Sequence, residues 1–455
     1  MNRRRFLKTA AVAGTAVSQA RASQPPNVVL ICADDLGFGD LACYGSRIKT
    51  PGISQLAAQG VMFRQCNSPG PVCSPARASL LTGRYPTRVG IPTVLFPNDA
   101  YGLPDSETTI AQMLKPAGYG TMCVGKWHLG SQPQFLPTNR GFDAYYGIPY
   151  SNDMNPSVLL QNTSVIEQPV QLNTLISRYT NQAVSFIQSA ASAPFFLYLA
   201  YNAPHLPLVP STAFTGASAL GAYGDVMQEI DWSVSQVMAA LAGAGVDQNT
   251  LVMLTSDHGP WFNGSAGKLR GRKSETWEGG VRVPLIARYP GAIPGGRVIQ
   301  TFVNTMDILP TIASVTGAAL PANPLDGVNI WPVLTGLQDA VEHDVFLYFD
   351  YWNLQCARMG RWKLHMSRYN TFPWSPAPAA GRFNLPLKPE LYDVESDPGE
   401  SYDTANQYPQ IATAIRARVD QLRPGFPSQV QDAWNDTFAR QVVHTVSGQL
   451  PIAQP

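Results

Sequence analysis

A thiol and a guanidinium lie close together at the start of a predicted helix. Residues 71–83 read P-V-C-S-P-A-R-A-S-L-L-T-G, so Cys73 precedes an apolar segment and Arg77 follows one turn later. We expect Ser74 to cap the helix and Pro75 to take its first position, where an N–H would be unpaired anyway. Cys73 would then lie where free N–H groups and the helix dipole attract anions. Arg77 adds a planar donor fork that suits a tetrahedral oxyanion. The segment predicts an anion site, and a buried structural cysteine is the alternative.

Two pairs of polar residues each follow an apolar run that reads as a buried strand. Asp34 and Asp35 end one such run, and Asp257 and His258 follow another. Adjacent carboxylates repel each other unless a cation lies beside them, and hard divalent cations prefer carboxylate oxygens. Ligands gather outside the carboxyl ends of strands in open α/β sheets. The pattern predicts a metal site with these residues as ligands; for Asp34 and Asp35 alone, solvated helix-capping aspartates are the alternative.

Further basic side chains follow other predicted strands. If residues 121–128 are extended, Lys126 and His128 share one face, because side chains alternate along a strand. A lysine beside a histidine suits an oxyanion partner and a proton-transfer group. The alternative is that both are structural polar residues at the end of a strand. His205 also emerges at the carboxyl end of a predicted strand, although a lone histidine there is more often a hydrogen-bonded core residue.

These segments resemble the motifs of the formylglycine-dependent sulfatases. Residues 73–77 match C-x-P-x-R, including the flanking A-S-L-L-T-G, and residues 118–128 resemble the second signature of that family. Lys273 precedes E-G-G-V-R, close to the family pattern K-x-x-x-x-E-G-G-x-R. The resemblance is strong over residues 27–284 and weak in the C-terminal part. It implies an alkaline-phosphatase-like α/β fold and hydrolysis of a sulfate monoester, an aryl or carbohydrate sulfate.

The resemblance also implies a role for each site residue. Cys73 would be oxidised to Cα-formylglycine by a maturation enzyme, and its hydrate would be the nucleophile. Asp34, Asp35, Asp257, His258 and the modified Cys73 would bind one divalent cation, with calcium expected first and magnesium or manganese as alternatives. Arg77, Lys126 and Lys273 would neutralise the sulfate oxygens. The other implied site residues are His205 as the acid for the leaving group, His128 as the base that releases sulfate, and Ser151 as a pocket residue.

Two positions depart from the usual family pattern. His258 stands where many members have asparagine, and Arg272 replaces a small residue before Lys273. Lys268 is a weaker candidate for the role of Lys273. Residues 142–153 favour relatives of arylsulfatase A and N-acetylgalactosamine-6-sulfatase. The alternatives are a phosphomonoesterase or phosphonate hydrolase of the same superfamily, and a sulfoglycan-binding protein without catalysis.

The N-terminal segment predicts export. Residues 2–8 read N-R-R-R-F-L-K, which resembles the twin-arginine motif, and a short apolar stretch and A-R-A follow. That stretch is too short for a permanent membrane anchor. We expect the twin-arginine machinery as a partner and a periplasmic or secreted protein. The net charge of +1 gives no case for nucleic acid as a partner.

The elements that must position these residues predict an α/β fold. Only 14% of the residues are charged and 45% are hydrophobic, so a large core can form. Apolar runs at residues 28–33, 195–201 and 251–256 alternate with predicted helices at 106–114 and 225–242, which predicts a mostly parallel sheet sandwiched by helices. A small antiparallel sheet plus helix should follow, with strands near 345–351, 355–366 and 390–394 and a helix near 408–422. The predicted parts are a signal peptide at 1–22, a catalytic domain at 23–336, and a C-terminal subdomain and tail at 337–455, with no readable pattern beyond 424.

Overall fold

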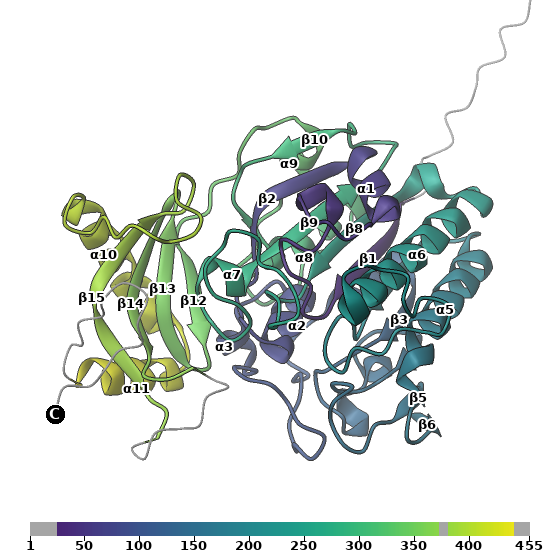
Figure 1. Cartoon of the computed structure of the whole chain (residues 1–455), viewed down its shortest axis with the longest axis horizontal. Coiled ribbons are helices and arrows are strands. Elements are labelled where there is room, and N and C mark those ends of the chain that lie inside the picture. Colours follow the sequence, from purple (N-terminus) through teal and green to yellow (C-terminus); the bar gives the residue numbers. More distant parts are fainter. Residues whose placement is uncertain (1–24, 373–380, 441–455) are drawn as a thin grey trace, which may run out of the picture.

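Two sheets organise the molecule (Figure 1). The computed structural model describes residues 25–372 and 381–440, so the predicted signal peptide at residues 1–22 lies outside the described residues. Within them, an 11-stranded mixed sheet has the order β10-β2-β9-β8-β1-β7-β3-β4-β5-β6, with β11 beside β2, and a separate antiparallel sheet has the order β12-β13-β14-β15. The predicted α/β class with a small antiparallel sheet is therefore confirmed.

The elements have the following bounds. The strands are β1 (Asn27–Ala33), β2 (Val61–Asn67), β3 (Gly120–Gly125), β4 (Ala144–Gly147), β5 (Leu159–Gln161), β6 (Ser164–Glu167), β7 (Phe195–Ala200), β8 (Thr250–Ser256), β9 (Arg282–Arg288), β10 (Arg297–Ile299), β11 (Val303–Asn304), β12 (Phe346–Asp350), β13 (Asn353–Met359), β14 (Trp362–Tyr369) and β15 (Asn384–Asp393). The α-helices are α1 (Pro51–Ala58), α2 (Cys73–Thr82), α3 (Pro86–Val89), α4 (Ile110–Leu114), α5 (Leu175–Ala190), α6 (Gly221–Gly243), α7 (Glu278–Val281), α8 (Ile308–Thr316), α9 (Trp331–Thr335), α10 (Pro409–Leu422) and α11 (Ser428–Phe438).

Helices cover both faces of the large sheet. Every residue of β1 is buried, and successive side chains enter opposite cores. Val28 and Leu30 pack in the core that contains residues of α2, α4, α8 and α9. Val29 and Ile31 pack in the core that contains residues of α1, α5 and α6. A strand buried on both faces needs a continuous apolar run, which is the pattern that the sequence shows.

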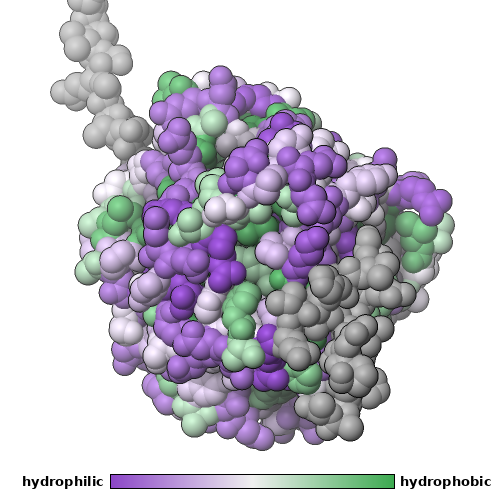
Figure 2. All heavy atoms as spheres, turned by 90° about the vertical axis from the view of Figure 1, so that its left-hand side faces the viewer, coloured by the Kyte–Doolittle hydropathy of each residue, from purple (hydrophilic) through white to green (hydrophobic). Residues whose placement is uncertain are grey.

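The C-terminal sheet packs against two helices and against the large domain. Ile415 of α10 and Trp434 of α11 share its core with Tyr85 and Met306 of the large domain. The hydroxyl of Tyr85 also accepts a hydrogen bond from the backbone N–H of Leu347 at 2.9 Å. On the outer face of this part, hydrophobic residues lie in small groups among hydrophilic ones (Figure 2).

Several predicted element boundaries are wrong. The helix predicted at residues 106–114 begins at Ile110, because Thr109 and Gln112 form a capping box there. The strand predicted at 355–366 is a hairpin of β13 and β14, with Gly360 in the left-handed region between them. Helix α11 lies where no pattern was recognised. The predicted domain boundary at residue 336 falls between α9 and β12 and stays a prediction.

Candidate active site

Four neighbouring parallel strands deliver most of the predicted site residues to one edge of the large sheet. The strands β8, β1, β7 and β3 are adjacent and run in the same direction. Their carboxyl ends therefore meet at one edge, as in other open α/β sheets. The residues that follow them are Asp257 and His258 after β8, Asp34 and Asp35 after β1, His205 after β7, and Lys126 and His128 after β3.

A cluster of possible metal ligands lies at this edge. Asp34, Asp35, Cys73 and His258 are buried, and each offers one ligand atom within 4.8 Å of the others. The Cys73 sulfur lies 3.4 Å from Asp34 Oδ1 and 3.4 Å from His258 Nε2. The imidazole Nδ1 of His258 donates to the backbone oxygen of Gly259 at 2.9 Å, so the lone pair of the neutral ring is on Nε2, which faces Cys73 and Asp35. Two carboxylates, a thiol and an imidazole fit a divalent cation.

Asp257 lies outside that four-atom set. Its Oδ1 is 3.6 Å from His258 Nε2, and its Oδ2 accepts a hydrogen bond from Arg77 Nε at 3.0 Å. Arg77 Nη1 donates to the backbone oxygen of Lys126 at 2.8 Å, and Nη2 lies 3.7 Å from Asp34. The Arg77 guanidinium is fully buried, and its contacts join three parts of the site.

Helix α2 starts differently from the prediction. Cys73 is its first residue and Val72 its N-cap, so Pro75 is the third residue. Ser74 does not cap the helix, because its hydroxyl accepts a hydrogen bond from the backbone N–H of Leu95 at 3.0 Å instead. The expectation that Cys73 lies at a helix N-terminus is nevertheless confirmed.

Two lysines contact the aspartates directly. Lys126 Nζ bonds Asp34 Oδ2 and donates to Ser151 Oγ at 3.2 Å, and Lys273 Nζ donates to Asp35 Oδ1 at 2.7 Å. Burial would raise the pKa of Asp34, but Lys126 and other nearby positive charges hold it well below its usual value. The geometry favours Lys273 over Lys268, because Lys268 is exposed on the loop before it.

The thiol of Cys73 lies in a strongly cationic environment. Burial and Asp34 raise its pKa, but Lys126, Lys273 and His258 lower it to well below its usual value. A thiolate is therefore stabilised at this position, and so is any other negatively charged group that replaces it.

The two remaining histidines have different settings. His128 is buried, and its Nε2 donates to the backbone oxygen of Leu95 at 2.8 Å. Nδ1 therefore carries the lone pair, and it has no hydrogen-bond partner among the described residues. Burial and Lys126 lower the pKa of His128, which favours the neutral ring, whereas Cys73 acts in the opposite direction. His205 Nε2 lies 3.8 Å from Asp35 Oδ2, and its Nδ1 bonds the backbone oxygen of Leu206 at 2.6 Å.

The predicted extended geometry of residues 121–128 is wrong in its second half. Strand β3 ends at Gly125, and His128 has a φ of 60°. Lys126 is nevertheless held in the site, because its backbone N–H bonds Ala200 on β7 at 2.7 Å. The two side chains reach the site through a turn and not through strand alternation.

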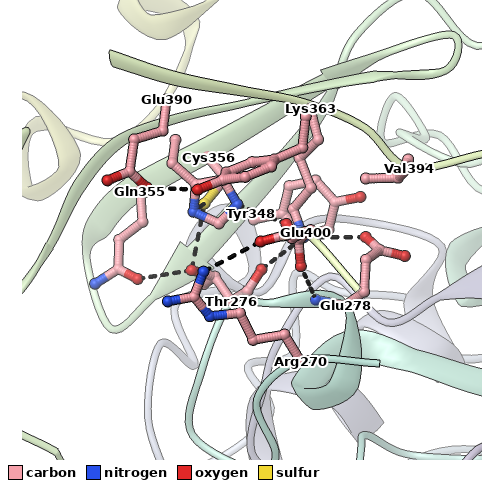
Figure 3. A network of polar contacts seen from close by, with 12 residues as sticks. Arg270, Thr276, Glu278, Tyr348, Gln355, Cys356, Lys363, Glu390, Val394 and Glu400 are labelled. Atoms are coloured by element: carbon pink, nitrogen blue, oxygen red, sulfur yellow. Dashed lines mark hydrogen bonds and ion pairs between the residues drawn. The ribbon is translucent and has the colours of Figure 1, made fainter. Parts of the chain in front are cut away.

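The sequence did not reveal what holds the segment that carries Lys273. A buried network joins this segment to the C-terminal sheet (Figure 3). Lys363 Nζ lies 2.7 Å from the Thr276 oxygen, 3.0 Å from Glu278 Oε1 and 3.2 Å from Glu400 Oε1. Glu400 also accepts from the backbone N–H of Glu278 at 2.6 Å. The signal in the sequence that could have indicated this network was Lys363, a charged residue inside the largely apolar run W-K-L-H-M.

Two family models match the chain. The model described as Sulfatase matches residues 26–318, and that of the C-terminal part of N-sulphoglucosamine sulphohydrolase matches residues 272–424. The second match crosses the boundary predicted at residue 336, which agrees with the buried network between the two sheets.

Full-length relatives and a solved structure agree with these matches. Arylsulfatase A from Homo sapiens is 37% identical over 479 residues, with 94% of this chain and 93% of the relative covered. N-acetylgalactosamine-6-sulfatase from Canis lupus familiaris is 38% identical over 395 residues, with 79% and 75% covered. A Bacteroides thetaiotaomicron structure from work on the metabolism of multiple glycosaminoglycans has a TM-score of 0.80 and 27% identity, with 88% of this chain and 99% of that chain covered. Since one family model spans more than half of the chain and the geometry agrees, the chain belongs to the sulfatase family, whose members are sulfuric ester hydrolases.

Proposed function

We propose that the chain hydrolyses sulfate monoesters with formylglycine, made from Cys73, as the nucleophile. The sulfur of Cys73 stands in for the hydroxyl oxygens of the aldehyde hydrate. The observation that carries the proposal is the position of this atom, 3.4 Å from Asp34 Oδ1 and 3.4 Å from His258 Nε2 at the start of α2. A hydrate is required because its second hydroxyl can eject sulfate by carbon–oxygen cleavage, which a serine hydroxyl cannot do.

A divalent cation bound by Asp34, Asp35, His258 and the modified residue 73 would act as a Lewis acid and lower the pKa of the attacking hydroxyl. We include Asp257 as a further ligand. Calcium is our first choice because three of the protein ligands are carboxylates, and magnesium or manganese are the alternatives because an imidazole is present.

The cationic side chains divide the remaining work. We assign the binding of the sulfate oxygens to Lys126, Lys273 and Ser151; the support is that each contacts a group beside the metal cluster. We assign Arg77 a positioning role, because its guanidinium contacts Asp257, Asp34 and the Lys126 backbone. Fixed cations around a sulfuryl group stabilise the charge that develops on its oxygens.

Two histidines would move protons. His205, assisted by Lys273, protonates the departing alcohol or phenol. His128 then removes a proton from the second hydroxyl of residue 73, which expels sulfate and restores the aldehyde. A base must be neutral with an available lone pair, and Nδ1 of His128 meets both conditions.

Mass spectrometry of active protein tests the nucleophile. We expect the peptide of residue 73 to carry formylglycine, and an unmodified thiol in fully active protein would refute the mechanism. Cys73→Ala should abolish turnover and leave the fold intact, whereas the matched control Cys43→Ala should keep turnover. Released inorganic sulfate should exceed phosphate by orders of magnitude when aryl sulfate and aryl phosphate are compared.

We propose an aryl sulfate or a carbohydrate sulfate as the substrate class. The support is the likeness to arylsulfatase A and N-acetylgalactosamine-6-sulfatase over most of the chain. A panel of sulfated monosaccharides and aryl sulfates, assayed for released sulfate, tests this choice.

We further propose that the protein is matured by a formylglycine-generating enzyme and exported by the twin-arginine machinery to the periplasm or beyond. The support for export is the sequence R-R-R-F-L-K near the N-terminus, and the support for maturation is C-S-P-A-R at residues 73–77. Among the helices of the described residues, none has the length and apolar character needed to cross a membrane. Fractionation of cells that express the chain with Arg3 and Arg4 changed to lysine tests the route, because the variant protein should then stay inside the cell.

A further inference from the structure

A large cavity lies outside the cluster around Cys73. It has a volume of about 850 Å³, and most of its lining comes from four segments, within residues 38–48, 64–65, 263–269 and 394–398. This volume is in the range of small-molecule sites, which is about 300–1,000 Å³. None of the metal-cluster residues or the proposed proton-transfer residues lines it.

The cavity is rich in uncompensated positive charge. Arg47, Arg64 and Lys268 line it and form no ion pair within residues 25–372 and 381–440. The whole chain has a net charge of only +1, so this concentration of cations is a local feature. Arg282 also contributes to the lining, but Glu278 neutralises it.

The acidic lining residues do not offset these cations. Asp40 uses its carboxylate to accept hydrogen bonds from the backbone of Gly37 and Ser265 and from the hydroxyl of Tyr223. Burial raises the pKa of Asp40 to about 7, so its charge is only partly present near neutrality. Glu395 adds one exposed carboxylate, so the three cations outside ion pairs still outnumber the acidic charge of the lining. The cavity therefore favours an anionic occupant.

The uncharged lining suits a sugar. Phe38 is half-buried and lies edge to face with the buried ring of Tyr44 at 4.9 Å, so the ring of Phe38 is the apolar surface that faces the cavity. Asn263, Gln300 and Ser46 add amide and hydroxyl groups. Rings that pack on sugar faces, together with amides that bond hydroxyl groups, are the recognition chemistry of a polar ligand with apolar faces.

We propose that this cavity is a second binding site, for a sulfated oligosaccharide, distinct from the site at Cys73. The preference for an anion rests on the cavity itself, and the choice of a sulfated saccharide rests on the proposed function. The cavity would hold one part of a sulfated glycan while the catalytic site acts on another part. The catalytic site would also act on small substrates that do not reach the cavity.

The walls of the cavity continue directly into the catalytic segments. Residues 38–40 follow Asp35, and residues 263–269 lie between His258 and Lys273. The base of this second loop is closed by a hydrogen bond from the Lys273 N–H to the Pro260 oxygen at 3.0 Å. The backbone N–H of Gly39 bonds the oxygen of Ser265 at 2.8 Å and joins the two walls. A glycan that binds here therefore stays close to the catalytic edge.

Calorimetric titration with a chondroitin sulfate tetrasaccharide tests the proposal. The parent is full-length Cys73→Ala, which releases no sulfate. Adding Arg47→Ala and Arg64→Ala should weaken binding at least tenfold at low salt, since hydrogen bonds to charged groups are the strong ones. The matched control, Lys388→Ala with Arg418→Ala, removes two exposed charges elsewhere and should stay within twofold of the parent.

Each contrary result overturns the proposal. One is that the tetrasaccharide does not bind the parent. Another is that it binds the arginine double variant as tightly as the control double variant. The third is that the chemically desulfated tetrasaccharide binds the parent as tightly as the sulfated one. The same two arginine substitutions in otherwise unaltered protein should leave aryl sulfate turnover within twofold. That assay reports on the proposed function independently, so a failure of the cavity and a failure of the catalytic mechanism give different results.

Discussion

Replacing Lys363 with methionine should destabilise the protein strongly and weaken catalysis. The Lys363 side chain is fully buried, and its ammonium lies 3.0 Å from Glu278 and 3.2 Å from Glu400. Methionine has a similar length but no charge, so the substitution leaves the two carboxylates without their shared cation. Removing one partner of a buried ion pair costs about 3–5 kcal/mol.

Two features limit the loss to the lower half of that range. Glu278 keeps the guanidinium of Arg282, which bonds it at 2.6 Å. Burial already raises the pKa of Glu400, so its carboxyl can take up a proton when the ammonium is removed. We therefore expect the free energy of unfolding to fall by about 3–4 kcal/mol. Catalysis should fall too, because Lys363 holds the Thr276 backbone at 2.7 Å in the segment that carries Lys273.

Urea denaturation followed by circular dichroism measures the change, with Lys388→Met on the exposed part of β15 as the matched control. Adding Glu400→Gln to Lys363→Met should recover part of the loss, because the amide needs no counter-ion. The reasoning is refuted if Lys363→Met costs less than about 1 kcal/mol, the value of an exposed pair. It is also refuted if the second substitution simply adds a further loss.

Three other changes give measurable outcomes. Burial raises the pKa of Asp350 to about 6, above its unfolded value of about 3.9. The protonated carboxyl therefore stabilises the folded state by about 3 kcal/mol below pH 4, and this stabilisation is lost as the pH rises through 6. Asp350→Asn should remove that loss when unfolding is measured at pH 4 and pH 7, and a variant with the same pH dependence as the parent would contradict the assignment. Calcium at about 100 times its dissociation constant should add about 2.7 kcal/mol of stability to chelator-treated protein, and Asp35→Ala should abolish this response in calorimetry. His128→Ala should lower kcat by about 10²–10⁴ and allow sulfated residue 73 to accumulate, which mass spectrometry of quenched protein detects; equal accumulation in the parent would exclude His128 as the base.

Local pattern was sufficient where burial alone fixes the structure. The apolar runs before Asp34 and Asp257 predicted buried strands, and their common direction brought the two pairs together as expected. The pairing of β1 with β8 itself joins residues more than 200 positions apart, so the neighbouring place of the two strands could not be predicted from local pattern.

Prediction failed where a distant group competes with a local one. Ser74 was expected to cap α2, but the Leu95 N–H takes its hydroxyl. Glu278 was visible in a motif, whereas Lys363 and Glu400 lie far along the chain and pair with it only after the second sheet packs on the first. No local periodicity carries such a pairing. Helix α11 is a different failure, because Val430 and Trp434 show the helical spacing of a buried face.

The charges at the candidate site explain why binding of a cation and binding of a sulfate ester should depend on each other. Three carboxylates, Asp34, Asp35 and Asp257, each have a close cationic partner, namely Lys126, Lys273 and Arg77 respectively. Each of these three pairs is electrically balanced, as a desolvated pair requires, and the thiol of Cys73 lies beside them. A divalent cation would add an excess of two positive charges. The single negative charge of a sulfate monoester and a deprotonated hydroxyl on residue 73 would restore the balance, while the fork of Arg77 keeps Asp257 in place.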